Sequence, residues 1–267
     1  MDLEPNAQRF SGFAGLYDRV RPSPPAAAAE LLRAYAGSPR PAVVDLGSGT
    51  GLSSRWCAGW ARRVIGVEPS EDMREQAATI GLANVEALPG WSHATGLPAG
   101  CADVVVAVQA LHWMDPEPTL AEVARILRPG GVFAALDCDW PPAVGNARAE
   151  TAWDRCMAAA VALEDRVPSG ARAWSKDGHL ARMRASGHFA FCRELAFHTT
   201  EPGDAARFVD LLRSQGGIQS LRKHGVDDAA IGVSVFADQV RAALGDGPCE
   251  ITFVYRMRVG VLAPATG

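Results

Sequence analysis

Three alternating glycines follow a short apolar run, and their spacing is the clearest sign of chemistry in this chain. The run 42–46 (AVVDL) predicts a buried strand, and the segment 47–51 (GSGTG) predicts a tight turn directly after it. Glycine lets a backbone bend sharply and lets a ligand approach the main chain, because no Cβ atom stands in the way. We therefore expect a ligand to lie along this turn.

Two acidic residues accompany the turn. Glu68 closes the next predicted strand, where a carboxylate can accept hydrogen bonds from both hydroxyls of a ribose. Asp45 precedes the glycines, and a buried carboxylate in this position is expected to hold an ammonium group directly or through water. The dinucleotide fingerprint G-x-G-x-x-G fails, because Leu52 stands three residues after Gly49. The segment therefore favours a nucleoside ligand without a pyrophosphate.

The elements that must position these residues alternate between strands and helices. Apolar runs predict strands at 42–46, 63–68, 85–88, 103–108 and 132–136. Helical patterns stand between them at 52–60, 70–81 and 120–127. The strand at 103–108 is apolar almost throughout, as parallel strands covered on both faces are. This order predicts an α/β fold with a doubly wound parallel sheet.

The second half of the chain has a different pattern. Residues 141–187 and 201–248 are expected to be mainly helical insertions that form a cap. Alternating apolar residues predict strands at 188–200 and 249–262, and Arg258 falls on the more polar face of the second. The whole chain, 1–267, is thus expected to be one domain with a seven-stranded, mostly parallel sheet and an antiparallel edge strand.

The remaining parts of that domain are an N-terminal lid at 1–38 and a ligand-binding core at 39–140.

Composition narrows the class of protein. The chain has 267 residues, 48% hydrophobic content and a net charge of −4, which argues against binding nucleic acid through phosphate neutralisation. Its six cysteines are scattered without metal-site spacing, which fits a reducing compartment. No leader or membrane-spanning run is evident. We expect a cytoplasmic protein without membrane partners, and the sequence leaves the oligomeric state open.

At this point the sequence resembles the class I S-adenosylmethionine-dependent methyltransferases. Four segments carry the likeness in the family's order: VVDLGSGTG at 43–51, GVEPSEDM at 66–73, GLPAGCADVVVAVQALHW at 96–113 and LAEVARILRPGGV at 120–132. Four matched segments are much more specific than one glycine turn. The pattern QALHW with RILRPGG is similar to the small-molecule branch that includes trans-aconitate methyltransferases. The resemblance implies a Rossmann-like fold and S-adenosylmethionine as cofactor.

The resemblance also implies roles for individual residues. The turn would lie along the methionine part of the cofactor, Glu68 would bind the ribose, and Tyr17 and Arg21 would close over the carboxylate and sulfonium. The residues implied in cofactor binding are Tyr17, Arg21, Asp45, Gly47, Ser48, Gly49, Thr50, Gly51, Glu68, Pro69, Met73, Ser92, His93, Gln109, Ala110 and Leu111. His93 departs from the family's usual small residue or acid at its position.

The acceptor side is less defined by the sequence. His112 follows the fourth strand and is the candidate catalytic base, because an unperturbed imidazole titrates near physiological pH. Trp113, Trp140 and Trp174 are candidates for the walls of a substrate pocket. The alternatives are structural: His112 can donate to a backbone carbonyl, and the tryptophans can pack in the core of the cap.

Two acids end the fifth predicted strand, and acids in this position can belong to a metal site. Asp137 and Asp139 could suggest a metal, as in catechol-type methyltransferases, but those enzymes also need an acid after the fourth strand. Gln109 stands there instead. We therefore expect no metal.

The sequence as a whole predicts a methyltransferase that acts on a small-molecule acceptor, with oxygen as the expected acceptor atom and S-adenosylhomocysteine as product. Two other classes remain open. One is a protein that binds S-adenosylmethionine and catalyses a different reaction, or none. The other is a nicotinamide-dependent oxidoreductase, which the residue Leu52 disfavours.

Overall fold

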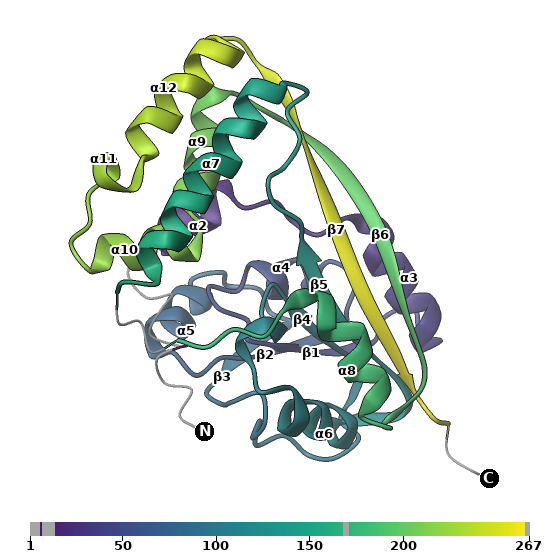
Figure 1. Cartoon of the computed structure of the whole chain (residues 1–267). Helices are drawn as coiled ribbons and strands as arrows, with labels where there is room; N and C mark the ends of the chain where they lie inside the picture. Colours follow the sequence, from purple (N-terminus) through teal and green to yellow (C-terminus); the bar gives the residue numbers. More distant parts are fainter. Residues whose placement is uncertain (1–5, 7–13, 168–170, 265–267) are drawn as a thin grey trace. The chain divides into compact units, whose positions relative to one another are not determined.

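The computed structural model describes residue 6 and residues 14–167 and 171–264 (Figure 1). Residues 1–5 and 7–13 of the expected N-terminal lid lie outside these ranges. In the described part, one seven-stranded sheet has the order β3-β2-β1-β4-β5-β7-β6. Its strands are β1 (Ala42–Leu46), β2 (Arg63–Val67), β3 (Val85–Leu88), β4 (Ala102–Val108), β5 (Leu127–Cys138), β6 (Phe189–Gly203) and β7 (Cys249–Leu262).

The pairing of the strands confirms the predicted fold class. Strands β1 to β5 pair in parallel, with crossovers on either side of β1, which is the doubly wound arrangement. Strand β7 pairs antiparallel with β5 and lies one place inside the edge strand β6. The sheet is therefore mostly parallel with one antiparallel strand, as the sequence predicts.

Strand β5 begins earlier than expected. The sequence predicted a helix to Leu127 and a strand from 132, but helix α6 (Pro116–Ile126) ends one residue earlier and β5 begins at Leu127. The segment 128–131 (RPGG) is therefore included in the strand, and the register between β4 and β5 shifts there. A Cβ atom on Gly131 would lie 2.8 Å from the carbonyl oxygen of Arg128, so glycine permits this crowded start.

Two compact units make up the chain. The sheet unit contains Ser23–Cys138, Arg172–Phe197 and Tyr255–Gly267, and the helical unit contains Met1–Pro22, Asp139–Ala171 and His198–Val254. Strands β6 and β7 contribute residues to both units. Residues 172–187, expected in the first helical insertion, belong to the sheet unit. The expectation of a single domain stays a prediction.

Helices cover both faces of the sheet in the sheet unit. They are α3 (Ala26–Ala36), α4 (Leu52–Ala58), α5 (Glu71–Ala78), α6 and α8 (His179–Ala185), with short 3₁₀ turns η1 (Leu111–Trp113) and η2 (Lys176–Gly178). Figure 1 shows α6 and α8 in front of the sheet and α3 and α4 behind it. Val104, Val105 and Phe133 are fully buried in the sheet's centre. Burial on both faces explains why these strands are continuously apolar.

The helical unit has its own aromatic core. Its helices are α2 (Ala14–Val20), α7 (Ala147–Glu164), α9 (Ala205–Arg213), α10 (Gly216–Lys223), α11 (Asp228–Ile231) and α12 (Val233–Leu244). Trp153 of α7 packs against Phe208 of α9 and Phe236 of α12, with ring centroids 5.2 Å and 6.0 Å away. These contacts fix the helices against one another through large apolar side chains.

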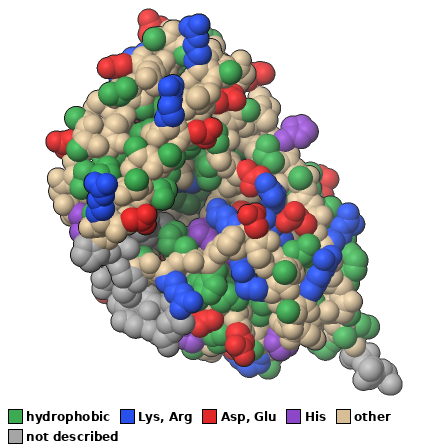
Figure 2. All heavy atoms as spheres, viewed as in Figure 1, with side chains coloured by type: hydrophobic (Ala, Val, Ile, Leu, Met, Phe, Trp, Pro, Cys, Tyr) green, Lys and Arg blue, Asp and Glu red, His purple; other side chains and the backbone are tan. Residues whose placement is uncertain are grey.

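Charges of both signs are interspersed on the face shown in Figure 2. This pattern agrees with the balanced composition, and the expectation that the protein does not bind nucleic acid stays a prediction. Within the described ranges, no helix is both long enough and apolar enough to cross a membrane.

Candidate active site

The glycine turn after β1 has a left-handed backbone at all three glycines. Gly47, Gly49 and Gly51 have φ angles of 65°, 54° and 85°, the left-handed region that favours glycine. A Cβ atom on Gly47 would lie 2.8 Å from the Met114 side chain and 2.9 Å from that of Ala110, so this glycine lets the turn after β4 approach. A Cβ atom on Gly49 would meet nothing within 4 Å, so the backbone there borders open space.

Glu68 lies against this turn, immediately after β2. Its Oε2 accepts a hydrogen bond from the Gly49 amide, and its Oε1 accepts one from the Ser70 amide, both at 3.0 Å. The carboxylate is buried, with 7% exposure, and burial raises its pKa although the two backbone bonds act the other way. Each oxygen retains lone pairs, so the carboxylate can still accept ribose hydroxyls.

Asp45 is satisfied mainly from inside the protein. It is fully buried, and its Oδ2 accepts hydrogen bonds from the hydroxyls of Ser53 and Ser54 at 2.7 Å each. Its Oδ1 has no hydrogen-bond partner. Burial raises the pKa of Asp45 to about 6, against the effect of the two serines. The carboxylate therefore braces the start of α4 against β1, and its contact with a ligand ammonium stays a prediction.

The residues expected around the adenine differ in their environments. Met73 is buried at the start of α5, and Pro69 is half-buried beside Glu68. Ser92 is buried, with its hydroxyl 2.8 Å from that of Thr119, whereas His93 is exposed. Their contacts with a cofactor stay predictions.

The turn after β4 carries a strained residue at the expected position. Gln109 has a φ of 54°, and it is the only non-glycine residue in the described ranges with a positive φ. Such a conformation costs about 1–3 kcal/mol and commonly marks a functional site. The side-chain amide donates to the Cys138 carbonyl at 3.3 Å, and its oxygen accepts from Lys176 Nζ at 2.8 Å. Ala110 and Leu111 follow in this turn and are buried.

His112 lies on η1 beside this turn and faces a carboxylate. Its Nδ1 is 3.5 Å from Oδ1 of Asp137, and its side chain is 12% exposed. Its ring is 4.9 Å from that of Trp113, and its backbone carbonyl accepts a hydrogen bond from the Trp174 amide at 2.8 Å. Burial lowers the pKa of His112, although the neighbouring Asp137 acts in the opposite direction. The imidazole is therefore neutral near pH 7.

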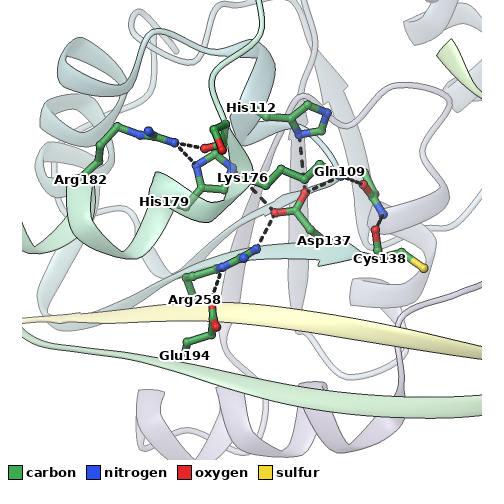
Figure 3. A network of polar contacts seen from close by, with 10 residues as sticks. Gln109, His112, Asp137, Cys138, Lys176, His179, Arg182, Glu194 and Arg258 are labelled. Atoms are coloured by element: carbon green, nitrogen blue, oxygen red, sulfur yellow. Dashed lines mark hydrogen bonds and ion pairs between the residues drawn. The ribbon is translucent and has the colours of Figure 1, made fainter. Parts of the chain in front are cut away.

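Asp137, at the end of β5, is the centre of a polar cluster (Figure 3). Its Oδ1 is 3.3 Å from Lys176 Nζ, and its Oδ2 accepts a hydrogen bond from Arg258 Nη1 at 3.0 Å. Nε2 of His179 lies 3.8 Å from the same Oδ2. Burial alone would raise the pKa of Asp137, but contacts with His112 and Lys176 outweigh it and hold the pKa well below its usual range. The carboxylate is therefore ionised.

Sequence reasoning missed Lys176, His179 and Arg258. Arg258 is on the face of β7 that the sequence assigned as more polar, yet its side chain is only 2% exposed because it is paired with Asp137 and Glu194. The alternating pattern of the strand predicted the face on which Arg258 lies, but it did not predict that the side chain is buried. Lys176 and His179 have no motif around them, and they lie in a segment that the sequence assigned to the cap.

Tyr17, Arg21 and Trp140 belong to the helical unit. The Arg21 guanidinium stacks 4.8 Å from the Tyr17 ring and 4.5 Å from the Trp140 ring, and it donates to the Ser214 carbonyl at 2.8 Å. Trp140 also stacks on Trp153, with ring centroids 5.8 Å apart. The expected lid role of Tyr17 and Arg21 and the expected pocket role of Trp140 stay predictions.

One group of side chains has the composition of a metal site. His112, Asp137 and His179 each offer one ligand atom, and these atoms all lie within 4.8 Å of one another. Two imidazoles and one carboxylate are a familiar metal-binding set. Here, however, the carboxylate is also shared with the cations of Lys176 and Arg258, which a metal ion would have to approach.

Comparisons with known proteins agree with this geometry. Residues 44–135 match the model of the methyltransferase domain family. An uncharacterized methyltransferase of Mycobacterium tuberculosis is 38% identical over 123 residues, which are 46% of this chain and 49% of that protein. The chain spans about half the length of the curated relatives it matches.

Solved structures extend the likeness over nearly the whole chain. A structure from Anaeromyxobacter dehalogenans, provisionally assigned as a type II methyltransferase, has a TM-score of 0.71 and 27% identity, over 91% of this chain and 99% of that one. The 4+2 cyclase SpnF shares the fold, with a TM-score of 0.55 and 19% identity over 97% of this chain and 96% of that one. Residues 44–135 therefore match a methyltransferase domain, and the sheet around them has the fold of solved methyltransferase structures.

Proposed function

We propose that the chain is an enzyme that transfers the methyl group of S-adenosylmethionine to an oxygen atom of a small molecule. The observation that carries this proposal is the position of His112. It lies beside a turn that packs directly on Gly47, and a buried carboxylate faces its ring. A potential base thus stands next to the backbone that the family uses for its cofactor.

The residues around the glycine turn fit the cofactor. Gly49 borders open space, and the Glu68 carboxylate beside it has lone pairs for both ribose hydroxyls. When bound, S-adenosylmethionine supplies an electrophilic methyl group on a sulfonium, so the protein must mainly align the acceptor and exclude water. Trp113, whose ring is 4.9 Å from that of His112, can provide an apolar wall for that purpose, and Trp174 is attached to the same residue through its backbone amide.

His112 has the protonation state that a general base needs. Because burial lowers its pKa, the ring is neutral at pH 7 and one nitrogen holds a lone pair. That nitrogen would take the proton of the acceptor hydroxyl and keep it. The cofactor would supply the methyl group to the acceptor oxygen and become a neutral thioether, so the proton on His112 balances the charge lost from the sulfonium. A general base contributes about 10²–10⁴-fold to such a step.

The test combines binding with product formation. Calorimetry of the full chain with S-adenosylhomocysteine, and separately with NAD, identifies the cofactor. Incubation with methyl-labelled S-adenosylmethionine and a metabolite extract, followed by mass spectrometry, identifies labelled products. We expect S-adenosylhomocysteine to bind and a labelled small molecule to form. His112→Ala should retain binding and lose at least about 100-fold in turnover, whereas His188→Ala, at an exposed histidine of the same unit, should behave as the wild type.

Each alternative function predicts a different result of this test. Binding of S-adenosylhomocysteine without any labelled product would favour a protein that uses the cofactor for another reaction, or for none. Binding of NAD instead would favour an oxidoreductase. Label found on nitrogen or carbon would contradict oxygen as the acceptor atom. A cytoplasmic location stays part of this proposal.

A further inference from the structure

Four side chains point their polar atoms at the Asp137 carboxylate, and they divide between its two oxygens (Figure 3). Oδ1 faces His112 Nδ1 at 3.5 Å and Lys176 Nζ at 3.3 Å. Oδ2 faces Arg258 Nη1 at 3.0 Å and His179 Nε2 at 3.8 Å. The carboxylate is only 2% exposed, so these groups take the place of water, Arg258 through a hydrogen bond and the other three through longer contacts.

The protonation of His179 follows from its other neighbour. Its Nδ1 lies 2.8 Å from Nη2 of Arg182, and a guanidinium group has donors but no acceptor. Nδ1 must therefore accept this hydrogen bond. Burial lowers the pKa of His179 to about 4, so the ring is neutral and carries its single proton on Nε2. This N–H is directed at Asp137.

This assignment decides between the two chemistries that the cluster could support. A protonated ring nitrogen has no lone pair and cannot coordinate a metal ion. The N–H of His179 therefore faces Asp137 at 3.8 Å, beyond hydrogen-bond distance, whereas Arg258 donates a hydrogen bond at 3.0 Å. The groups around this carboxylate face it with protons rather than lone pairs, and the same electrostatics favour a proton on the His112 atom that faces it.

We propose that Asp137 is a positioning residue, which holds the proton of neutral His112 on Nδ1 and so leaves the lone pair on Nε2 for the substrate. Figure 3 shows the second ring nitrogen of His112 pointing away from Asp137. The inference rests on the proposed function, since it specifies how the base of that reaction is prepared. Hydrogen bonds of catalytic groups are often long without substrate, so the distance of 3.5 Å is compatible with this role.

Lys176 has an opposing influence on the same base. It shares Oδ1 of Asp137 with His112, and its side chain is 32% exposed and anchored by Gln109. As a cation it disfavours protonation of His112, whereas Asp137 favours it. His179 and Arg258 act on His112 through Asp137. Removing Lys176 and removing the charge of Asp137 should therefore move the titration of His112 in opposite directions.

The first test reads the tautomer without any substrate. The full chain is labelled with ¹⁵N-histidine, and long-range ¹H–¹⁵N spectra are recorded at pH 8 with S-adenosylhomocysteine present. The loss of signals in His112→Gln assigns the ring. We expect His112 with its proton on Nδ1 and His179 with its proton on Nε2. A proton on Nε2 of His112 in the wild type would overturn the proposal, whether or not the protein methylates anything.

Variants supply the second test. In Asp137→Asn, Arg258 keeps the amide oxygen, so the amide NH₂ faces Nδ1 of His112 and the proton moves to Nε2. Turnover should fall about 10²–10⁴-fold with cofactor affinity unchanged. In Lys176→Gln the acidic limb of the pH–rate profile should move to higher pH, and in Asp137→Asn it should move to lower pH. Asp177→Asn, exposed on the same turn η2, is the matched control and should change nothing.

The outcomes separate the two proposals. A correct tautomer in a protein that forms no methylated product leaves the positioning of His112 intact and removes the proposed function. Methyl transfer with equal turnover in wild type and Asp137→Asn overturns the positioning role alone. If Asp137→Asn fails to fold, the wild-type tautomer and the direction of the Lys176→Gln shift decide, because neither needs that variant.

Discussion

Glu68→Gln tests the proposed contact between Glu68 and the ribose of the cofactor. The substitution keeps the size of the side chain and removes its charge. One oxygen becomes an NH₂ group that faces a backbone amide, either that of Gly49 or that of Ser70, each now 3.0 Å from an oxygen. The new NH₂ group then faces a backbone N–H group, so two donors oppose each other. The variant has one acceptor oxygen, whereas the wild-type carboxylate has two.

The expected loss follows from these contacts. A hydrogen bond to a charged group contributes about 1.5–3 kcal/mol, and one of the two bonds to the ribose is lost. The dissociation constant for S-adenosylhomocysteine should therefore rise roughly 10- to 150-fold. Burial raises the pKa of Glu68, so the carboxylate protonates more readily than an exposed one as the pH falls. The difference between variant and wild type should therefore shrink in acid.

Calorimetry with two ligands isolates the ribose contact from general damage. S-adenosylhomocysteine and its 2′-deoxy analogue are each titrated into wild type and variant. The wild type should lose affinity for the deoxy analogue, and Glu68→Gln should lose much less, which gives a coupling energy above about 0.5 kcal/mol. Glu75→Gln, on the exposed face of α5, is the control. Equal losses in both proteins would refute the assignment of Glu68 to the ribose.

Three further predictions concern the backbone, the buried histidine and the metal. Gly47→Ala places a Cβ atom 2.8 Å from the Met114 side chain, in a left-handed backbone conformation. It should therefore lower the free energy of unfolding by about 1–3 kcal/mol, as measured by denaturation, and weaken cofactor binding, as measured by calorimetry. An unchanged stability would contradict the close approach of the turn after β4 to Gly47. The pKa of His179 is about 4 in the folded state and 6.5 in the unfolded state, so the unfolded state binds more protons and the free energy of unfolding decreases as the pH falls from 7 to 4. His179→Gln should make this decrease smaller by about 3 kcal/mol than in the wild type. His188→Gln is the control and should leave the decrease unchanged. Arg182→Glu offers only acceptors to Nδ1 of His179, which moves the proton to Nδ1 and frees Nε2. Co²⁺ should therefore bind this variant more tightly than the wild type, as its absorption spectrum reports, and equal binding would contradict the assigned tautomer.

The fold was predictable because its signals are local. The strands β1 and β3 have the predicted bounds, and β2 differs by one residue, because buried parallel strands must be apolar on both faces. The glycine turn was equally predictable, since only glycine adopts its backbone angles without strain. The start of β5 was wrong by five residues, because proline and glycine ordinarily end structure and here continue into a strand.

The polar cluster was not predictable from local patterns. Asp137 and Arg258 are 121 residues apart and meet only because β7 pairs antiparallel with β5. His179 follows no motif, and its role depends on Arg182 one turn further along α8. His112 was found because it follows a strong strand, but the carboxylate that faces it could be recognised only in three dimensions.

The residues of the proposed site are divided between the matched domain and the segments that follow it, and this matters for relatives that share only the domain. The matched domain ends at residue 135, so it contains the glycine turn, Glu68 and His112 but not the carboxylate that faces the His112 ring. Asp137, Lys176, His179 and Arg258 all follow it. A relative can therefore match this domain without the groups that we propose hold the proton of His112 on Nδ1. The cyclase SpnF shares the fold, so the fold alone does not fix the reaction. A relative with the matched domain and no carboxylate at the place of Asp137 should bind S-adenosylhomocysteine yet need an acceptor that is already ionised.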